Sequence, residues 1–327
     1  VPGTELPDSY PNATNPETVW VNVRNNATGC YSVGTFDLIV DEPAVANPVT
    51  DPALITKCDT DGTNDGLADF DLTAFDATVL GTQPAGDFTV HYYDDRAEAE
   101  ADGDLGITST NPNALTGLNP YHTATATIYA LVINRTSTTG CPAIVAIPLT
   151  VNRLPEVTLE GGFYCVDPVT LDPLNTFTLT AVTDNGANPA DYTYVWTRDG
   201  GVLPDTGSTL VVDEQGSYTV TATNIATGCV SEPSDAAIVT ATSAAIITDV
   251  TVTNAFTDNA TITVVVDPTS LGDYEYKLDE GPWQQGNVFA PVSAGDHIVY
   301  VRDRNDGGCQ DSQPVPVSVI DLSLIHI

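Results

Sequence analysis

The sequence predicts an all-β protein made of tandem immunoglobulin-like β-sandwich domains in an elongated array. Three observations predict this fold class: apolar and polar residues alternate with a period of two in most segments, Gly and Pro interrupt these segments throughout, and one pattern of strand, turn and cysteine recurs along the chain. The chain has 327 residues. Because a single hydrophobic core stops growing at roughly 250–300 residues, several domains are expected.

The recurring pattern is an alternating run of β-branched and aromatic residues, a polar turn and a cysteine. Its copies end at Cys30, Cys141, Cys229 and Cys309, at spacings of about 80 to 110 residues, which is the size of an immunoglobulin-like sandwich. A second strand-like run follows each cysteine, and the turn residues tolerate the backbone angles of tight hairpins. Each repeat is therefore expected to end in a β-hairpin with its cysteine at the turn.

Proline-containing or small-residue linkers separate the repeats at Pro43 to Pro52, at Leu154-Pro155 and at Thr240 to Ala245. The predicted domains are the C-terminal part of an incomplete repeat (1–46), two complete repeats (47–154 and 155–242) and a fourth repeat (243–321). Residues 1–46 are too few to bury a sheet face alone, so we expect them to be poorly packed or to borrow a neighbour. One exception to the strand pattern, residues 95–102 (DRAEAEAD), predicts a short surface helix.

The two ends of the chain predict a fragment of a longer protein. Residue 1 is Val, and no charged and apolar signal segment follows it. The last six residues, 322–327 (LSLIHI), resemble the translated end of a sequencing adapter, so we expect a non-native tail.

The third repeat carries the clearest sandwich signature. Cys165 comes early, Trp196 lies in the middle and Cys229 comes late, the order in which an indole packs on a disulfide between two sheets. This order predicts a Cys165–Cys229 bridge against Trp196. The alternative is that Trp196 is an ordinary core residue.

The same reasoning pairs the early and late cysteines of the second repeat and predicts a Cys58–Cys141 bridge. Cys30 and Cys309 are late cysteines without an early partner in their repeats, so both are expected to be unpaired; a Cys30–Cys58 bridge across the first linker is the competing arrangement. Because persistent disulfides need an oxidising compartment, we expect an extracellular location. The alternative is a cytosolic protein with six buried thiols.

The charge balance argues against two classes of partner. The chain has 44 Asp and Glu residues against 9 Lys and Arg, a formal net charge of −35. Nucleic-acid binders neutralise phosphates with basic patches, and anionic lipids attract basic segments, so neither nucleic acid nor an anionic membrane surface is expected as a partner. No apolar run reaches the ~20 residues that span a bilayer.

One local motif predicts a metal site. Residues 59–69 (DTDGTNDGLAD) place oxygen side chains at alternate positions, and Gly66 permits a sharp turn, which suits a hard cation such as Ca²⁺. The predicted ligands are Asp59, Asp61, Asp65 and Asp69. Leu72 stands where an EF-hand has its bidentate glutamate, so the motif predicts a looser calcium loop. The alternative is a solvated turn beside Cys58.

No arrangement of residues predicts catalysis. The histidines, which are His91, His122, His297 and His326, stand in separate sequence contexts. No metalloprotease, nucleophile-elbow, P-loop or dinucleotide-binding motif occurs. We therefore expect no enzyme and assign no catalytic residue.

Trp283 is a candidate ligand-binding residue. It lies in the turn-like segment 279–286 (DEGPWQQG), where an exposed indole would stack on a sugar. The alternative is that Trp283 packs under its own loop, because large aromatic side chains are mostly buried.

Several segments resemble a known group of proteins. They are, in the second repeat, Cys58-Asp59, 69–73 (DFDLT), Tyr92-Tyr93, 97–100 (AEAE), Asn119-Pro120 and 139–141 (TGC), and in the fourth repeat 274–279 (YEYKLD), Trp283 and 299–304 (VYVRDR). Together they resemble the tandem immunoglobulin-like repeats of type IX-secreted surface adhesins of gliding bacteria, which continue into a type B sorting domain. The resemblance implies export across the outer membrane and attachment at the cell surface, and it carries over no catalytic residue.

These observations predict a non-catalytic structural or adhesive stalk that holds a binding tip away from the cell. Its partners would be the neighbouring repeats of the same polypeptide. Two alternatives are a module that binds surface glycans or a matrix polymer, and accessory repeats attached to an enzyme encoded upstream. No cofactor is expected other than calcium.

Overall fold

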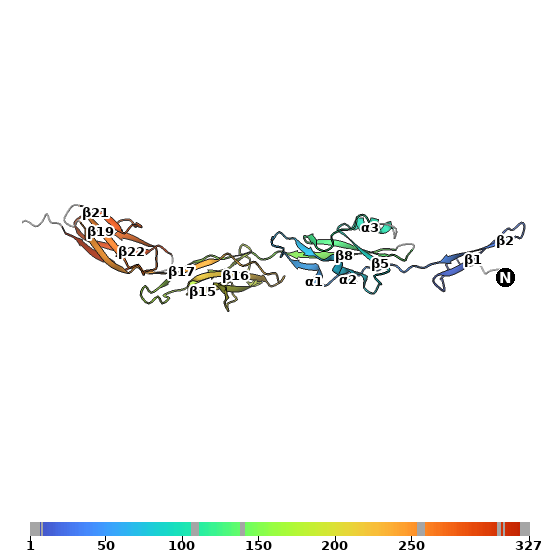
Figure 1. The fold of residues 1–327 in the computed structure, drawn as a ribbon, viewed down its shortest axis with the longest axis horizontal. Helices are drawn as coiled ribbons and strands as arrows, with labels where there is room; N and C mark the ends of the chain where they lie inside the picture. Colours follow the sequence, from blue (N-terminus) through green and yellow to red (C-terminus); the bar gives the residue numbers. More distant parts are fainter. Residues whose placement is uncertain are drawn as a thin grey trace, which may run out of the picture. The chain divides into compact units, whose positions relative to one another are not determined.

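Strands dominate the structure, a computed structural model that describes residues 7, 9–105, 111–137, 141–253, 259–305, 309 and 311–320. The predicted tail, residues 322–327, lies outside the described residues. The chain divides into two compact units, Val1–Arg153 and Leu154–Ile327. Each unit is built mainly of antiparallel strand pairs arranged in β-sandwiches (Figure 1), so the predicted all-β fold class is confirmed.

Unit 1 begins with a two-stranded hairpin. Strands β1 (Glu17–Arg24) and β2 (Tyr31–Leu38) pair antiparallel over their whole length. The turn closes because the Asn25 N–H donates to the Cys30 carbonyl oxygen at 2.8 Å. Of the strand residues, Val19 alone is buried, whereas Trp20 is 73% exposed. The hairpin packs few of its side chains because two strands cannot enclose a core.

The rest of unit 1 is a β-sandwich with short helices, which we call the second sandwich. Its elements are α1 (Pro52–Ile55), β3 (Thr56–Cys58), β4 (Ala68–Phe70), η1 (Leu72–Phe75), α2 (Asp76–Leu80), β5 (Phe88–Tyr93), α3 (Arg96–Asp104), β6 (Tyr121–Thr123), β7 (Ala126–Asn134) and β8 (Ala143–Asn152). The sheets have the orders β3-β8-β7-β5 and β4-β6. Phe70, Ile128 and Ile147 belong to one buried core cluster, contributed by β4, β7 and β8.

The predicted surface helix is present as α3. It begins after Asp95, whose carboxylate accepts hydrogen bonds from two N–H groups of the first turn at 2.6 and 3.3 Å. Ala99 of the helix packs with Leu131 and Ile133 of β7. Because side chains alternate along a strand, these two residues face away from the core that holds Ile128. Helix α3 therefore covers the outer face of the four-stranded sheet.

Unit 2 contains two sandwiches, the third and the fourth. The third sandwich consists of β9 (Val157–Thr158), β10 (Gly162–Val166), β11 (Phe177–Thr180), β12 (Val182–Thr183), η3 (Pro189–Asp191), β13 (Tyr192–Arg198), β14 (Gly201–Val202), β15 (Thr209–Val212), β16 (Gly216–Asn224) and β17 (Ala237–Ser243). Its largest sheet has the order β10-β17-β16-β13-β14. The core is built around Trp196, which is fully buried and donates its indole N–H to the Gly207 carbonyl oxygen at 2.8 Å.

The fourth sandwich has two three-stranded sheets. Its strands are β18 (Ile247–Thr253), β19 (Ala260–Val266), β20 (Tyr274–Leu278), β21 (Val288–Val292), β22 (Gly295–Asp303) and β23 (Val315–Val319). The orders are β18-β19-β21 and β20-β22-β23. Apolar residues of β19 and β22, such as Ile262, Val264, Val299 and Val301, are fully buried between the sheets.

The hairpin predicted for each repeat is present. Antiparallel pairing joins β1 to β2, β7 to β8, β16 to β17 and β22 to β23. Each pair encloses a cysteine in its connection, which confirms that the spacing of the four cysteines marks a structural repeat. The repeat thus follows from strand alternation and turn chemistry, which are local properties of the sequence.

Candidate functional site

The third and fourth sandwiches meet at a buried polar junction. Strand β17 runs parallel to β10, which places Thr242 beside Cys165 and Ser243 beside Val166. Gly161, just before β10, lies so close to the Ile238 backbone of β17 that a Cβ atom would clash. Three residues, 244–246, separate β17 from β18 of the next sandwich. Thr242 and Ser243 are both 0% exposed.

Hydrogen bonds from these two residues reach into the fourth sandwich. The Thr242 hydroxyl contacts the Leu271 carbonyl oxygen at 2.9 Å and the Asp303 carboxylate. The Ser243 N–H also donates to the Leu271 carbonyl oxygen, and the Ser243 hydroxyl accepts from the Leu271 N–H at 2.9 Å. The Tyr274 hydroxyl donates to the Ser243 carbonyl oxygen at 3.0 Å. The last strand of one sandwich is thus bonded to a loop and two strands of the next.

Asp303 completes the junction from the side of the fourth sandwich. Its second carboxylate oxygen accepts hydrogen bonds from the backbone N–H groups of Asp273 and Asn305, at 3.0 and 3.1 Å. Burial raises the pKa of Tyr274, and the nearby Asp303 charge acts in the same direction. Tyr274 therefore stays a neutral hydrogen-bond donor at neutral pH.

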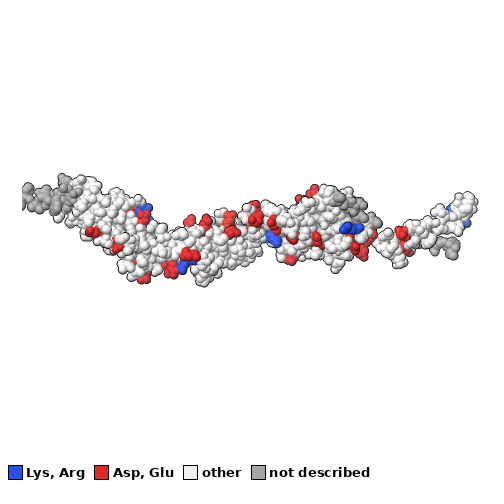
Figure 2. Space-filling model, viewed as in Figure 1, with Lys and Arg blue, Asp and Glu red and all other residues white. Residues whose placement is uncertain are grey.

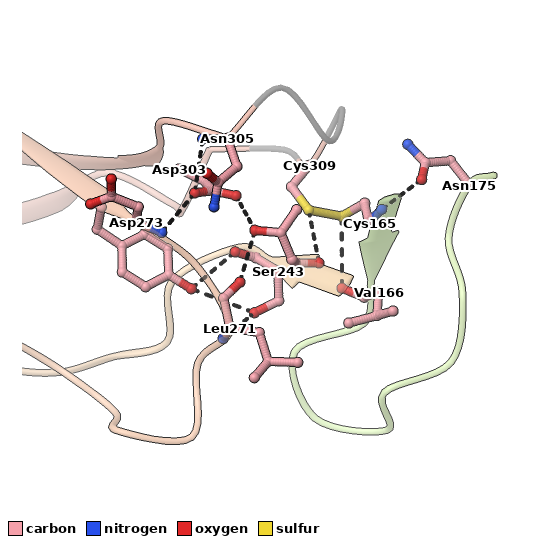
Figure 3. The surroundings of a disulfide bond; sticks show 11 residues. Cys165, Val166, Asn175, Ser243, Leu271, Asp273, Asp303, Asn305 and Cys309 are labelled. Carbon is pink, nitrogen blue, oxygen red and sulfur yellow. Dashed lines mark hydrogen bonds between the residues drawn. A yellow bond between two sulfur atoms is a disulfide. The ribbon is translucent and has the colours of Figure 1, made fainter. Parts of the chain in front are cut away.

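A disulfide between Cys165 and Cys309 lies beside this network (Figure 3). Cys165 is in β10 of the third sandwich, and Cys309 follows β22 of the fourth. The Cα atoms are 5.1 Å apart, and the two residues are separated by 144 positions in sequence. The Cys165 N–H donates to the Asn175 side-chain oxygen at 2.6 Å, and the Cys309 sulfur lies 3.3 Å from the Thr242 carbonyl oxygen. The bond joins one sandwich covalently to the next.

The predicted Cys165–Cys229 bridge is therefore wrong, and so is the prediction that Cys309 is unpaired. Strand β10 is the edge strand of its sheet, and Cys165 pairs in register with Thr242 near the end of β17, where the chain enters the fourth sandwich. Cys229 is also disulfide-bonded, but not to Cys165. Trp196 accordingly does not pack on the predicted bridge, and the alternative of an ordinary core residue is correct.

The predicted Cys58–Cys141 bridge is also wrong. Cys58 is disulfide-bonded, but Cys141 is not its partner. Cys58 pairs in register with Asn152 at the end of β8, whereas Cys141 precedes the start of that strand. Ten residues of extended strand span about 30 Å, far beyond the roughly 7 Å that a disulfide allows between Cα atoms. Cys30 is exposed with a free thiol, so the competing Cys30–Cys58 bridge is not formed either.

Residues 59–67, here called the aspartate loop, connect β3 to β4 in the second sandwich. One carboxylate oxygen from each of Asp59, Asp61 and Asp65 lies within 4.8 Å of the other two. Asp61 accepts hydrogen bonds from the backbone N–H of Thr63 at 2.9 Å and from its hydroxyl at 3.0 Å. These two bonds lower the pKa of Asp61, so its carboxyl group is ionised at neutral pH. The structure brings three of the four predicted ligands together.

Asp69, the fourth predicted ligand, lies outside this group of three. Pairing of β4 with β6 sets Asp69 opposite His122, whose Nδ1 is 2.9 Å from the Asp69 carboxylate. The hydrogen bond with Asp69 is the main cause of a raised pKa for His122. The His122 Nε2 also lies 4.0 Å from Asp61. Asp69 therefore binds a histidine in the structure, because the strand directs its side chain toward β6.

Trp283 lies against cationic side chains of its own sandwich. The Arg302 guanidinium carbon is 4.1 Å from the indole centroid, and the Lys277 ammonium is 5.6 Å from it. Arg302 also forms an ion pair with Glu275. Trp283 is half-buried and lines a shallow hollow of about 540 Å³ together with Gln284 and both of these charged groups. The guanidinium thus occupies a position over the ring where a sugar would stack.

The described histidines serve separate local contacts. His297 is 9% exposed and lies 2.7 Å from Asp279 and 2.9 Å from the Ser293 carbonyl oxygen. The hydrogen bond with Asp279 raises the pKa of His297. Burial lowers the pKa of His91 in β5. His326 lies outside the described residues.

Sequence reasoning missed the junction residues. Thr242 and Ser243 lie in a predicted linker, and Tyr274 and Asp303 lie in segments that resemble surface adhesins, but no pattern in the sequence indicated that these residues meet. A signal was nonetheless present, since Thr242 and Ser243 are two consecutive small polar residues immediately before the apolar start of the fourth repeat. Their role becomes visible only when the loop that contains Leu271 lies against them.

One protein-family model matches part of the chain. The Flavobacterium inter-domain disulphide bond domain matches residues 3–44 and 54–155, which make up less than half of the chain and lie almost wholly in unit 1. The description of that family agrees with the kind of bond found between Cys165 and Cys309, although these cysteines lie outside the match. A comparison with curated proteins finds no match. No helix in the described part of the chain has both the length and the apolar character for a bilayer span.

Three solved structures are similar to the chain at low sequence identity. The FN1–FN3 domains of chicken CNTN1 are 13% identical with a TM-score of 0.32, over 71% of this chain and 89% of that chain. The three N-terminal domains of the bacteriophage RB49 highly immunogenic outer capsid protein are 15% identical with a TM-score of 0.38, over 74% and 92%. The fibronectin(III)-like modules of Clostridium thermocellum CbhA are 14% identical with a TM-score of 0.30, over 53% and 98%.

Proposed function

We propose that this chain is a non-catalytic, extracellular stalk segment of a large surface protein, in which covalent bonds between neighbouring sandwiches prevent unravelling under tension. One observation carries the proposal: the Cys165–Cys309 disulfide joins the third sandwich to the fourth instead of joining the two sheets of one sandwich. The partners of the segment are then the neighbouring repeats of the same polypeptide, and its task is to hold an adhesive tip away from the cell.

The position of the disulfide explains how it would act under load. A force pulling on the two ends of unit 2 passes from Cys165 directly to Cys309 through the bond. The chain between them, which includes most of the third and fourth sandwiches, is then excluded from the loaded path. The chain between the two cysteines cannot extend even if its strands separate, because a covalent bond withstands forces that break the hydrogen bonds of a sheet.

The buried junction supports a fixed geometry between the two sandwiches. Thr242 and Ser243 are fully buried and are bonded to Leu271, Tyr274 and Asp303 across the junction. Buried polar groups are costly to leave without partners, so any bending that separates these groups is opposed. Three residues connect β17 to β18, and so short a connection limits how far the two sandwiches can move apart.

Charge and redox chemistry support a location outside the cell. Disulfides persist in oxidising compartments and are rare in the cytosol. Acidic residues are scattered over the visible face of both units, with few basic ones among them (Figure 2). A net charge of −35 keeps neighbouring copies apart by repulsion. The resemblance to type IX-secreted adhesins supports export by that route and attachment through a sorting domain.

Single-molecule force spectroscopy of the full chain, held by its two ends, tests the proposal. In the Cys309→Ser variant the fourth sandwich becomes extensible. With Cys229→Ser in both chains, which removes the disulfide of Cys229, the 144 positions from Cys165 to Cys309 then add about 490 Å to the final extension, at about 3.4 Å per residue. Cys30→Ser is the matched control, because it changes an exposed free thiol and is expected to leave the extension unchanged. Equal extensions with and without Cys309→Ser in the Cys229→Ser background would refute the proposal.

A further inference from the structure

The aspartate loop holds a buried carboxylate oxygen that lacks a partner. Asp59 is 1% exposed. Its Oδ2 accepts a hydrogen bond from the Gly66 N–H at 2.5 Å, whereas its Oδ1 has no hydrogen-bond partner among the described residues. Buried polar atoms almost always have a partner, and a buried carboxylate oxygen needs one more than a neutral atom does. This oxygen therefore indicates a missing ligand.

The surrounding charges favour a cation as the partner of this oxygen. Asp61 and Asp65 each place a carboxylate oxygen within 4.8 Å of the Asp59 carboxylate. Arg153 donates to the carbonyl oxygens of residues 64 and 65 at 3.2 and 2.7 Å, and His122 bonds to Asp69 through Nδ1 while its Nε2 lies 4.0 Å from Asp61, so neither basic side chain bonds to the Asp59 Oδ1. Three acidic groups at this spacing repel one another unless a positive charge lies between them.

We propose that Asp59, Asp61 and Asp65 bind one calcium ion. Calcium binds oxygen ligands at 2.3–2.6 Å, so two oxygens on the same ion lie at most about 5 Å apart. The observed spacing, within 4.8 Å, fits one ion held by an oxygen from each residue. Calcium takes six to eight ligands, and water completes the shell because Asp61 and Asp65 are exposed.

The surrounding structure holds the site in place. The Asp59 N–H donates to the Asn152 carbonyl oxygen at 2.9 Å, which ties the start of the aspartate loop to the end of β8. Arg153 holds its far side through two backbone carbonyl oxygens, and Gly66 has a φ of 91° and passes close to the Arg153 guanidinium. The ion therefore joins a loop that is already fixed at both ends, and binding needs little rearrangement.

The expected affinity follows from the ligand set. Three carboxylates with several water ligands resemble the calcium sites of extracellular modules, which bind with Kd values of roughly 10⁻⁴–10⁻³ M. Magnesium requires shorter bonds and near-ideal octahedral geometry and gives up its water reluctantly, so we expect it to bind at least about tenfold more weakly.

Isothermal titration of the full chain with calcium chloride at physiological salt tests the site. The wild type is expected to show one saturable site, and Asp61→Asn or Asp65→Asn is expected to weaken it roughly tenfold or more. The exposed positions keep the test valid if the buried Asp59→Asn variant fails to fold. Hydrogen–deuterium exchange should show calcium-dependent protection of residues 59–67 in the wild type only.

Asp267→Asn is the matched control. Asp267 accepts hydrogen bonds from the N–H and hydroxyl of Thr269 at 2.9 and 2.7 Å, the same arrangement that Asp61 makes with Thr63. Asp61→Asn and Asp267→Asn remove the same charge, so a general effect of the acidic surface would lower the calcium affinity of both variants equally. No saturable binding up to about 10 mM calcium, equal affinities in the two variants, or equal affinity for magnesium would overturn the proposal.

Discussion

Removal of the Cys165–Cys309 bond is expected to destabilise the fourth sandwich far more than any single side-chain contact would. When this sandwich unfolds while the third stays folded, the bond closes a loop between Ser243, at the end of β17, and Cys309. This loop contains about 66 residues, and the chain-entropy model assigns its closure about 4 kcal/mol at 25 °C. The Cys309→Ser variant should therefore unfold its fourth sandwich about 15–30 °C lower than the wild type does, since 1 kcal/mol shifts the midpoint of a domain of this size by about 4–8 °C.

Differential scanning calorimetry of the full chain measures this shift. The second sandwich, in unit 1, provides an internal reference whose transition should not move. Cys30→Ser makes the same chemical change at an exposed free thiol and should leave every transition in place. The Cys165→Ser/Cys309→Ser double variant prevents the remaining thiol from forming another disulfide and should match the single variant. A loss below about 1 kcal/mol, or an equal loss in Cys30→Ser, would refute the loop-closure reasoning.

Two further predictions concern local contacts. The hydrogen bond with Asp279 raises the pKa of His297 above its unfolded value of about 6.5. The stabilisation of the folded state by protonated His297 is therefore complete below that pH and is lost as the pH rises through the folded pKa. His297→Gln should destabilise the fourth sandwich by about 0.5–1 kcal/mol near pH 5.5 and by less near pH 8 in thermal unfolding; a pH-independent difference would contradict this. Asp102 of α3 is fully buried and accepts two hydrogen bonds from Asn113 and one from a tyrosine hydroxyl. Asp102→Ala should therefore lower the free energy of unfolding of unit 1 by about 2–4 kcal/mol in chemical denaturation, whereas Asp104→Ala, at an exposed position of the same helix, should lower it by less than about 0.5 kcal/mol. Similar losses in the two variants would contradict the role of these bonds.

The fold class, the hairpins and helix α3 could be predicted from the sequence because their signals are local. Alternation with a period of two directs side chains to opposite sides of a strand, and Asp95 caps a helix from two residues away. The grouping of Asp59, Asp61 and Asp65 was predictable for the same reason, since seven residues of one loop contain all three. Asp69 fell outside the group because it belongs to β4, whose pairing with β6 directs it to His122.

The disulfide pairing could not be predicted from the spacing of cysteines. The sequence showed correctly which cysteines stand at equivalent places in the repeats, but a disulfide forms only where two Cα atoms come within roughly 7 Å. The strand neighbours decide this distance. Parallel pairing of β10 with β17 places Cys165 near the start of the next sandwich, where Cys309 meets it. The length of β8 separates Cys58 from Cys141.

The sequence by itself determined that this protein is a series of acidic β-sandwiches, each ending in a hairpin that carries a cysteine. Only the tertiary structure decided that one disulfide joins two sandwiches and that Thr242, Ser243 and Asp303 form a buried junction beneath it. The physical reason is the range of the forces involved. Strand alternation and turns depend on neighbours along the chain, whereas disulfides and buried polar contacts depend on which distant segments pack together.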